Sequence, residues 1–208
     1  MLTFKYKSFV CKSLRGDGDQ SCVEGLRSYV KSMYIKSGYN GFSDDYDRRF
    51  DPDSVYFYVT DNSDIRAVQR VIHKTPNNLL PLENATVYDA PENMRYSINE
   101  PNVAEITSFV FNGPHVVDLL FSSVAYYGKL NKIRKAFALL DVESKKLKKI
   151  YCKIGWQESE EFPSLIYFPD YGKNVNGRFA PTLWKIMELP EKTILGIAEN
   201  VKKFEVLS

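Results

Sequence analysis

The sequence predicts a mixed α/β fold, arranged as a single domain over residues 1–208. Segments with the two-residue period of strands alternate along the chain with segments of helical spacing. Hydrophobic residues make up 44% of the chain and charged residues 26%, a composition typical of globular proteins. Aromatic residues make up 14% and the net charge is only +2, which excludes a disordered chain.

The first segments predict a strand followed by a helix. Residues 2–7 alternate apolar and polar side chains, the pattern of a half-buried strand, which residues 9–11 extend. Ser21 and Glu24 have the spacing of a capping box, so a helix follows, with Gly38 as its stop. The apolar residues of this helix are Val23, Leu26, Val30, Met33 and Tyr34.

Residues 55–72 predict a β-hairpin. Residues 55–60 are rich in aromatic and β-branched side chains, residues 61–64 have turn composition, and residues 65–72 form the returning strand. The next segment, residues 73–103, carries four prolines and no regular period. An irregular segment of this length inside a compact domain is usually functional or mobile, and we expect a short helix within it.

The second half of the chain continues with alternating strands and helices. Residues 104–111 predict a buried strand, and residues 112–114 interrupt the chain. Residues 116–127 are apolar almost all round, which predicts a central helix covered on several sides. The short apolar run 136–140 is typical of a strand in a parallel pair.

The C-terminal segments predict two helices around a pair of strands. Asp141 is the expected cap of the first helix and Gly155 its end. Residues 165–168 and 179–187 predict strands, and Pro190 opens a final helix. The apolar faces of the two helices are Val142, Leu147, Ile150, Tyr151 and Ile154, and Ile194, Leu195, Ala198, Val201 and Phe204.

The sequence excludes several kinds of site and location. Neither the three cysteines (Cys11, Cys22, Cys152) nor the two histidines (His73, His115) have metal-ligand spacing, so we predict no metal site. No glycine-rich phosphate loop is present. No run of about 18 apolar residues is available to cross a membrane. The N-terminal residues lack the apolar core of a signal peptide, so we expect a protein of the reducing cytoplasm.

Several short motifs follow one another along the chain, in two groups. In the second half, Tyr151 precedes Gly155-Trp156 by four residues. In the first half, Arg27 lies on the first helix, which ends near Gly38-Tyr39, and the acidic stretch 44–51 (DDYDRRFD) follows.

Further motifs complete this order. The hairpin carries Arg70 on its second strand, residues 80–83 read LPLE, and the next strand carries Glu105. With these motifs the sequence resembles the GNAT acyltransferase superfamily, and within it the branch of autoinducer synthases and long-chain N-acyl amino acid synthases. The resemblance implies a central splayed, mostly antiparallel sheet flanked by helices.

The sequence departs from this branch at two positions. The branch often has arginine three residues after the strand glutamate, and Ser108 stands there instead. The glycine-rich pyrophosphate loop of acetyl-CoA users is absent, and residues 112–115 (NGPH) take its place. A carrier protein would need no such loop, because it presents pantetheine without the adenine nucleotide.

The resemblance implies acyl transfer from a thioester to an amine. This chemistry needs a base for the amine, fixed hydrogen-bond donors for the oxyanion and an acid for the leaving thiolate. Glu105 is the candidate base, and an ion pair with Arg70 or Arg95 is its structural alternative. Tyr151 is the candidate acid, and its alternative is an ordinary place on the apolar helix face.

The resemblance also implies a donor side. The backbone of Phe109, Val110 and Phe111 would hydrogen-bond the pantetheine arm if the two central strands splay. The irregular segment would wall an acyl-chain tunnel, although loop packing explains the same side chains equally well. The residues concerned are Leu79, Leu80, Leu82, Met94 and Tyr96.

The acceptor side is assigned in the same way. Arg27, Asp44, Asp47 and Arg70 are its candidates, because this cluster links the N-terminal loop to the site in the resembling families. A surface ion-pair network that fixes the loop is the alternative.

Charge is concentrated between Lys129 and Lys153, where nine basic and two acidic residues give a local net charge of +7. A basic patch would steer an acidic acyl carrier protein toward the enzyme, and a solvated helix face is the alternative. Nucleic acid is disfavoured, because the aromatic residues here have core spacing. The predicted docking residues are Lys132, Arg134, Lys135, Lys145, Lys146, Lys148 and Lys149.

We therefore expect a bacterial N-acyltransferase without a permanently bound cofactor. It would move a medium or long acyl chain from acyl carrier protein or acyl-CoA to the amine of a small acceptor such as an amino acid. Two alternatives stay open. One is an acetyl-CoA-dependent GNAT enzyme that acts on a polyamine or a protein lysine, and the other is a GNAT-shaped binding module without catalysis.

Overall fold

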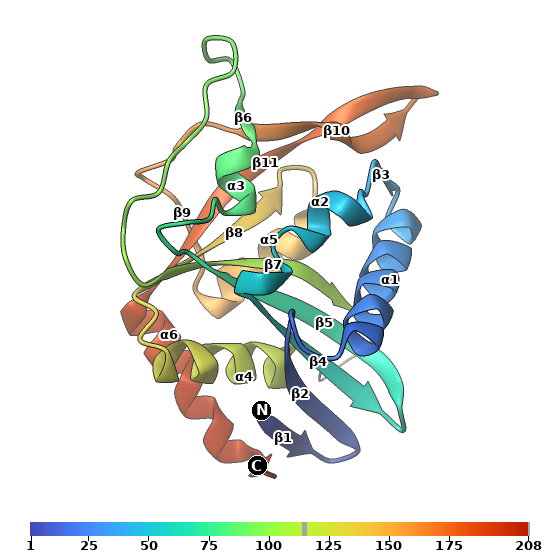
Figure 1. Cartoon of the computed structure of the whole chain (residues 1–208), viewed down its shortest axis with the longest axis vertical. Coiled ribbons are helices and arrows are strands. Elements are labelled where there is room, and N and C mark those ends of the chain that lie inside the picture. Colours follow the sequence, from blue (N-terminus) through green and yellow to red (C-terminus); the bar gives the residue numbers. More distant parts are fainter. Residues whose placement is uncertain (114–115, 208) are drawn as a thin grey trace.

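The computed structural model describes residues 1–113 and 116–207 and shows one sheet covered by helices (Figure 1). The strands are β1 (Thr3–Tyr6), β2 (Phe9–Arg15), β3 (Tyr39–Asn40), β4 (Ser54–Asp61), β5 (Asp64–His73), β6 (Thr86–Val87), β7 (Val103–Phe111), β8 (Lys135–Asp141), β9 (Gln157–Glu158), β10 (Ile166–Val175), β11 (Arg178–Pro190) and β12 (Glu205–Val206). The α-helices are α1 (Gln20–Lys36), α2 (Asp44–Arg48), α3 (Pro81–Asn84), α4 (Val116–Leu130), α5 (Lys145–Ile154) and α6 (Glu191–Ala198). Two 3₁₀ turns cover Asp51–Asp53 and Glu199–Lys203.

The strands of the described residues join a single mixed sheet. Its order is β12-β1-β2-β4-β5-β7-β8-β11-β10-β3, with β6 beside β10 and β9 beside β11. Strands β7 and β8 are parallel, and the other pairs are antiparallel. The predicted mixed α/β fold with a mostly antiparallel sheet is confirmed, and so are the β4–β5 hairpin and the short helix inside residues 73–103.

The first strand was predicted as one segment and is a hairpin instead. Lys7 adopts a left-handed φ of 58°, which reverses the chain between β1 and β2. The predicted cap of α1 is also wrong. The carboxylate of Asp19 accepts a hydrogen bond from the Cys22 N–H at 3.1 Å, so Ser21 lies inside the first turn.

Helix α5 begins and ends at well-defined caps. The Ser144 hydroxyl accepts from the Leu147 N–H at 3.3 Å, so Ser144 and not Asp141 is the N-cap. Gly155 ends the helix as predicted, with a left-handed φ of 104° that favours glycine.

Helices cover both faces of the sheet. On one face, α4 and α6 pack together, and apolar residues of α4, α5 and α6 share one core with β7 and β8. On the other face, α1 packs over Tyr56 and Val68, and residues around α3 form a separate core with β10 and β11. No helix among the described residues is long and apolar enough to cross a membrane.

The parallel strands β7 and β8 stay together over only half their length. They pair from Val103 opposite Lys135 to Ile106 opposite Ala138, and no further pairs follow. Beyond Ile106 the two strands therefore diverge, as the resemblance implied. The N–H and C=O groups of residues 107–111 on this edge are left without a strand partner.

A β-bulge lies on β7 where the strands separate. Its pairing with β5 slips by one residue between Thr107 and Val110, and Ser108 in between has a φ of 55°. The extra residue resets the alternation of side chains. Phe109 consequently faces the same core as Ile106, and Val110 packs toward α1 on the opposite face.

Candidate active site

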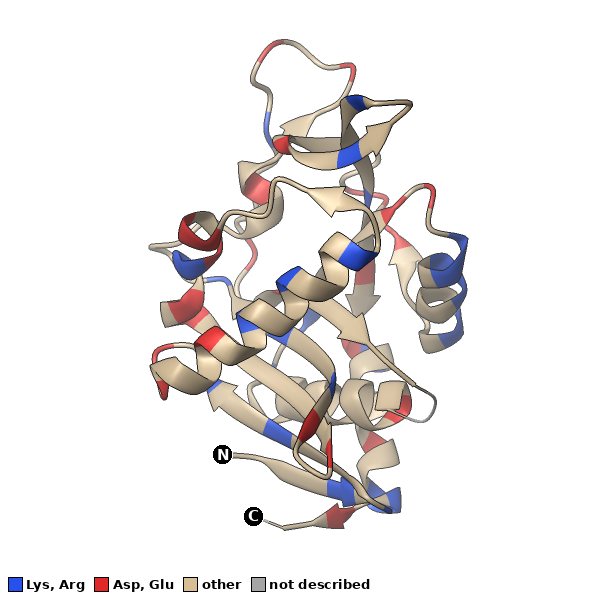
Figure 2. Cartoon of the chain, turned by 90° about the vertical axis from the view of Figure 1, so that its right-hand side faces the viewer, with Lys and Arg blue, Asp and Glu red and all other residues tan. Residues whose placement is uncertain are grey.

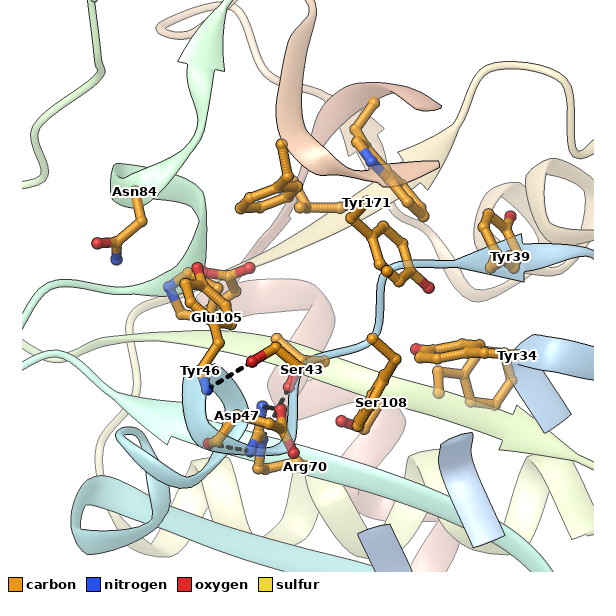
Figure 3. A pocket seen from close by; sticks show the side chains of 18 of the residues that line it. Tyr34, Tyr39, Ser43, Tyr46, Asp47, Arg70, Asn84, Glu105, Ser108 and Tyr171 are labelled. Carbon is orange, nitrogen blue, oxygen red and sulfur yellow. Dashed lines mark hydrogen bonds and ion pairs between the residues drawn. The ribbon is translucent and has the colours of Figure 1, made fainter. Parts of the chain in front are cut away.

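A cavity of about 430 Å³ opens where β7 and β8 diverge (Figure 3). Its walls come from β5, β7 and β8, from the end of α1 through β3 to α2, from α3 and α5, and from the β10–β11 pair. Glu105 enters from the sheet face that carries α3, and Tyr151 enters from the face that carries α5. The cavity thus connects the two faces of the sheet beside the bulge.

Glu105 is fully buried on β7 and lines this cavity. Its Oε2 accepts a hydrogen bond from the Leu82 N–H at 2.9 Å, and its Oε1 has no partner among the described residues. Burial raises the pKa of this carboxyl to about 8, against the opposing effects of the Leu82 hydrogen bond and the Arg70 charge. The ion pairs of the described residues do not include Glu105. A buried carboxyl with a free oxygen and this pKa suits proton transfer near neutral pH.

Tyr151 is 3% exposed, on the inner face of α5, and lines the same cavity. Its ring stacks on Trp156 at 5.3 Å between ring centres and faces Phe109 at 6.4 Å. Burial, together with nearby Tyr34 and Glu105, raises the pKa of the phenol well above its usual value. The hydroxyl therefore keeps its proton at neutral pH, as an acid for a leaving thiolate must.

Two of the four predicted acceptor-side residues lie at the cavity wall. Arg70 and Asp47 both line it, with 2.5 Å between Nη2 and Oδ1. Arg27 is buried against Asp51, and Asp44 is exposed and pairs with Lys31, so neither of these two predicted residues lines the cavity.

Asp51 joins the two buried arginines into one network. It contacts Arg27, lies 3.7 Å from Arg70 Nη1 and accepts from the Tyr56 hydroxyl at 2.9 Å. Burial raises the pKa of Asp51 despite these partners. The network fixes the segment that follows α2 against the sheet. Arg27 therefore holds this segment in place and does not itself reach the cavity.

An aromatic wall that the sequence did not predict forms one side of the cavity. Tyr39 stacks on Tyr171 at 5.6 Å and on Trp184 at 5.9 Å, with interplanar angles of 8° and 18°. Figure 3 shows Tyr34, Tyr39 and Tyr171 together on this side, away from Glu105 and Tyr46. Because these rings come from segments far apart in the chain, local sequence pattern gives no signal for them.

Asp141 anchors this aromatic wall from the end of β8. Its Oδ2 accepts from the Tyr39 hydroxyl and from Lys173 Nζ, both at 2.5 Å. Burial would raise the pKa of Asp141, but these hydrogen bonds outweigh it and hold the pKa below its usual value. Its Oδ1 accepts from the Glu143 N–H at 2.9 Å, so both oxygens are engaged, and Asp141, which lies before the Ser144 cap, does not cap α5.

The five residues predicted to wall an acyl-chain tunnel do not line the cavity. Leu80 and Leu82 are fully buried in the core around α3, and Leu79 and Met94 are 52% and 44% exposed. Tyr96 packs against Phe162 in the same core. From this segment, Pro81 and Asn84 line the cavity.

The predicted docking residues fall into two groups. Lys132, Arg134 and Lys135 precede or begin β8, and Lys135 is paired with Glu100 at 2.7 Å and Glu161 at 3.2 Å. The second group is the exposed lysine face of α5, visible as the blue helix at the right of Figure 2. This face consists of Lys145, Lys146, Lys148 and Lys149. None of these four lysines makes an ion pair within the described residues.

The α5 lysine face reaches the diverging end of β7. Lys146 Nζ lies 4.7 Å from the ring centre of Phe111, the last residue of that strand. Phe109, Val110 and Phe111, the predicted donor-side residues, belong to the stretch of β7 without a partner on the β8 side. A positive surface therefore borders the diverging end of β7.

The described residues hold no group of three or more histidines, cysteines and carboxylates that could bind a metal. His73 bonds to the Tyr127 hydroxyl at 2.8 Å and does not line the cavity. Pro114 and His115, which we predicted to be a break and a structural histidine, lie outside the described residues.

No protein-family model matches the sequence, and no curated protein matches it either. The structure, however, is similar to solved acyltransferases. An N-acyl amino acid synthase from uncultured soil microbes (FeeM) matches with a TM-score of 0.60 and 16% identity, over 93% of this chain and 97% of that one. Spermidine N-acetyltransferase from Vibrio cholerae, solved with CoA and spermine, matches with 0.54 and 14%, over 91% and 99%.

A probable acetyltransferase from Staphylococcus epidermidis gives a TM-score of 0.52 and 10% identity, over 86% of this chain and 97% of that one. The chain therefore has the fold of the GNAT superfamily. Within that class it resembles the N-acyl amino acid synthase, which confirms the resemblance found in the sequence at the level of fold.

Proposed function

We propose that the protein is an N-acyltransferase that moves an acyl group from a pantetheine thioester to the amine of a small acceptor. The observation that carries this proposal is the cavity at the split between β7 and β8. There Glu105, whose Oε1 has no partner within residues 1–113 and 116–207, and Tyr151, a protonated phenol, line one space.

The reaction begins when the amine nitrogen attacks the thioester carbonyl carbon. Glu105 accepts the amine proton, directly or through a water molecule. Backbone N–H groups at the bulge around Ser108 donate to the developing oxyanion, because they have no strand partner on that side. The C–S bond then breaks, the amide forms, and the Tyr151 hydroxyl protonates the leaving thiolate.

The donor arm would lie along the unpaired edge of β7. Backbone groups of residues 109–111 would hydrogen-bond the two amides of pantetheine, as an added strand would. The α5 lysine face next to Phe111 would hold the rest of the donor. We favour acyl carrier protein over CoA, because an acidic protein surface complements an extended row of unpaired lysines. We expect this enzyme in the bacterial cytoplasm.

The test is acyl transfer from acyl carrier protein and from CoA, each with acyl chains of several lengths, to a mixture of amines and amino acids. Products are identified by mass spectrometry. Leu139→Trp fills the cavity from β8 and is expected to abolish transfer. Leu195→Trp adds the same ring at a site on α6 that is 39% exposed, and it should leave transfer unchanged.

Each outcome decides between the functions. Transfer that Leu139→Trp removes and Leu195→Trp retains supports the proposal. Transfer from acetyl-CoA alone favours the acetyltransferase alternative. Absence of transfer from every donor contradicts the proposal and favours a binding module.

A further inference from the structure

The cavity has an excess of negative charge. The acids that line it are Asp47, Asp170 and Glu105, of which Glu105 is mostly protonated at pH 7, and Arg70 is the single cation among the described lining residues. An acceptor with its own carboxylate would add a further negative charge to this space. A cation with free N–H donors is the strongest partner for such a group in a buried site.

Arg70 has almost no free donors. Its Nε donates to Thr107 Oγ1 at 3.1 Å, and its Nη1 donates to the Tyr56 hydroxyl at 3.0 Å and the Asp47 carbonyl at 3.2 Å. Its Nη2 donates to Asp47 Oδ1 at 2.5 Å. These four bonds use four of the five N–H groups of a guanidinium. The side chain is also 3% exposed, so it neutralises Asp47 and cannot turn toward a ligand.

Two further cations, Lys173 and Arg49, contact residues that line the cavity, and neither supplies the missing charge. Lys173 donates to Asp141 at 2.5 Å and lies 3.7 Å from Glu143. Arg49 lies 4.5 Å from the ring centre of Tyr46, but it is not part of the cavity lining.

The same walls suit an amine with an apolar body. Glu105 Oε1 and the Tyr46 hydroxyl are buried and have no partner among the described residues, so both are available to an amine N–H. The stacked rings of Tyr39, Tyr171 and Trp184 offer a flat apolar surface on the other side. Aromatic faces also attract cations, which lets the amine enter as an ammonium before it loses its proton.

We propose that the acceptor is a primary amine without a carboxylate and with an apolar or aromatic body, and not an amino acid. This inference rests on the proposed N-acyl transfer and narrows its acceptor. The observation behind it is that every cation at the cavity is already committed to a carboxylate of the protein or lies outside the lining.

The test compares three acceptors that differ in one group: phenethylamine, phenylalaninamide and phenylalanine. Values of kcat/KM are measured with one donor and corrected for the fraction of neutral amine at each pH. We expect phenethylamine and phenylalaninamide to exceed phenylalanine by about tenfold or more, because phenylalanine alone brings an unpaired charge. Asn84→Arg places a cation in the lining and should reduce this ratio, whereas Asn84→Gln should retain it.

Phenylalanine acylated as fast as phenethylamine, or faster, overturns this inference and leaves the N-acyltransferase function intact. If no acceptor is acylated, the proposed function fails instead. Calorimetric titration with the same three compounds then decides the inference separately, because tighter binding of phenylalanine would overturn it and tighter binding of phenethylamine would support it.

Discussion

The substitution Glu105→Gln tests whether Glu105 is the catalytic base, because it retains the side-chain shape and removes the ionisable group. Glu105 has a pKa of about 8. About one tenth of the enzyme therefore carries the basic carboxylate at pH 7, and about nine tenths at pH 9. We expect kcat/KM to rise about tenfold between these pH values and then to level off.

The variant should lose both the rate and the pH response. General base catalysis contributes about 10²- to 10⁴-fold, so kcat/KM of Glu105→Gln should fall by that factor. The assay is steady-state acyl transfer from pH 6 to pH 10 with two acceptor amines of different pKa. The inflection due to Glu105 stays near pH 8 with both acceptors, whereas one due to the amine moves with the acceptor.

Protein stability gives an independent measure of the same carboxyl. Its folded pKa lies above the ordinary value of 4.5, so the folded chain binds this proton more tightly, and the free energy of unfolding falls as the pH rises from about 4.5 to about 8. The full shift corresponds to about 5 kcal/mol, an upper bound on what Glu105→Gln gains over the natural chain at pH 9.

Two results would refute this reasoning. One is a Glu105→Gln enzyme that retains the natural rate and the inflection near pH 8. The other is a free energy of unfolding whose pH dependence above pH 5 is the same in the two proteins, because the buried carboxyl would then have an ordinary pKa.

Other contacts give three further expectations. Tyr151→Phe should lower transfer by about 10²-fold or more with alkyl thioesters and recover with aryl thioesters, whose thiolates need no acid; equal losses with both donors would exclude the acid role. Gly41→Ala places Cβ 1.6 Å from the Asp170 carbonyl oxygen and should lower Tm more than Gly38→Ala, which has a similar φ and open space; equal losses would contradict this packing. Glutamate at all four lysines 145, 146, 148 and 149 should lower kcat/KM about tenfold with acyl carrier protein but not with acyl-pantetheine; equal loss with both donors would contradict docking.

Local pattern predicted the elements of this fold better than their ends. The β4–β5 hairpin and the left-handed end of α5 at Gly155 depend on neighbouring residues alone, and both were predicted. Capping depends on competition between nearby polar groups. Asp19 precedes Ser21 and takes the capping position, and Asp141 is held by Tyr39 and Lys173 from distant strands.

The sequence predicted those site residues that belong to a short motif of their own. Glu105 and Tyr151 were named from the sequence, and the structure brings both to one cavity, although their chemical roles stay predictions. The aromatic wall could not be predicted, because it joins side chains more than a hundred residues apart. The hydrogen bonds that occupy Arg70 could not be predicted either, because they reach α2 and two neighbouring strands.

The bulge at Ser108 shifts the alternation of side chains along β7 by one residue. Before the bulge the even-numbered residue Ile106 faces α4, whereas after it the odd-numbered residues Phe109 and Phe111 face that side. If residue 108 were paired as an ordinary strand residue, without the bulge, Phe109 and Phe111 would face the side of α1 and Val110 would face α4, with no change in the sequence. The placement of these three side chains therefore depends on the left-handed φ at position 108, which the residue there must tolerate.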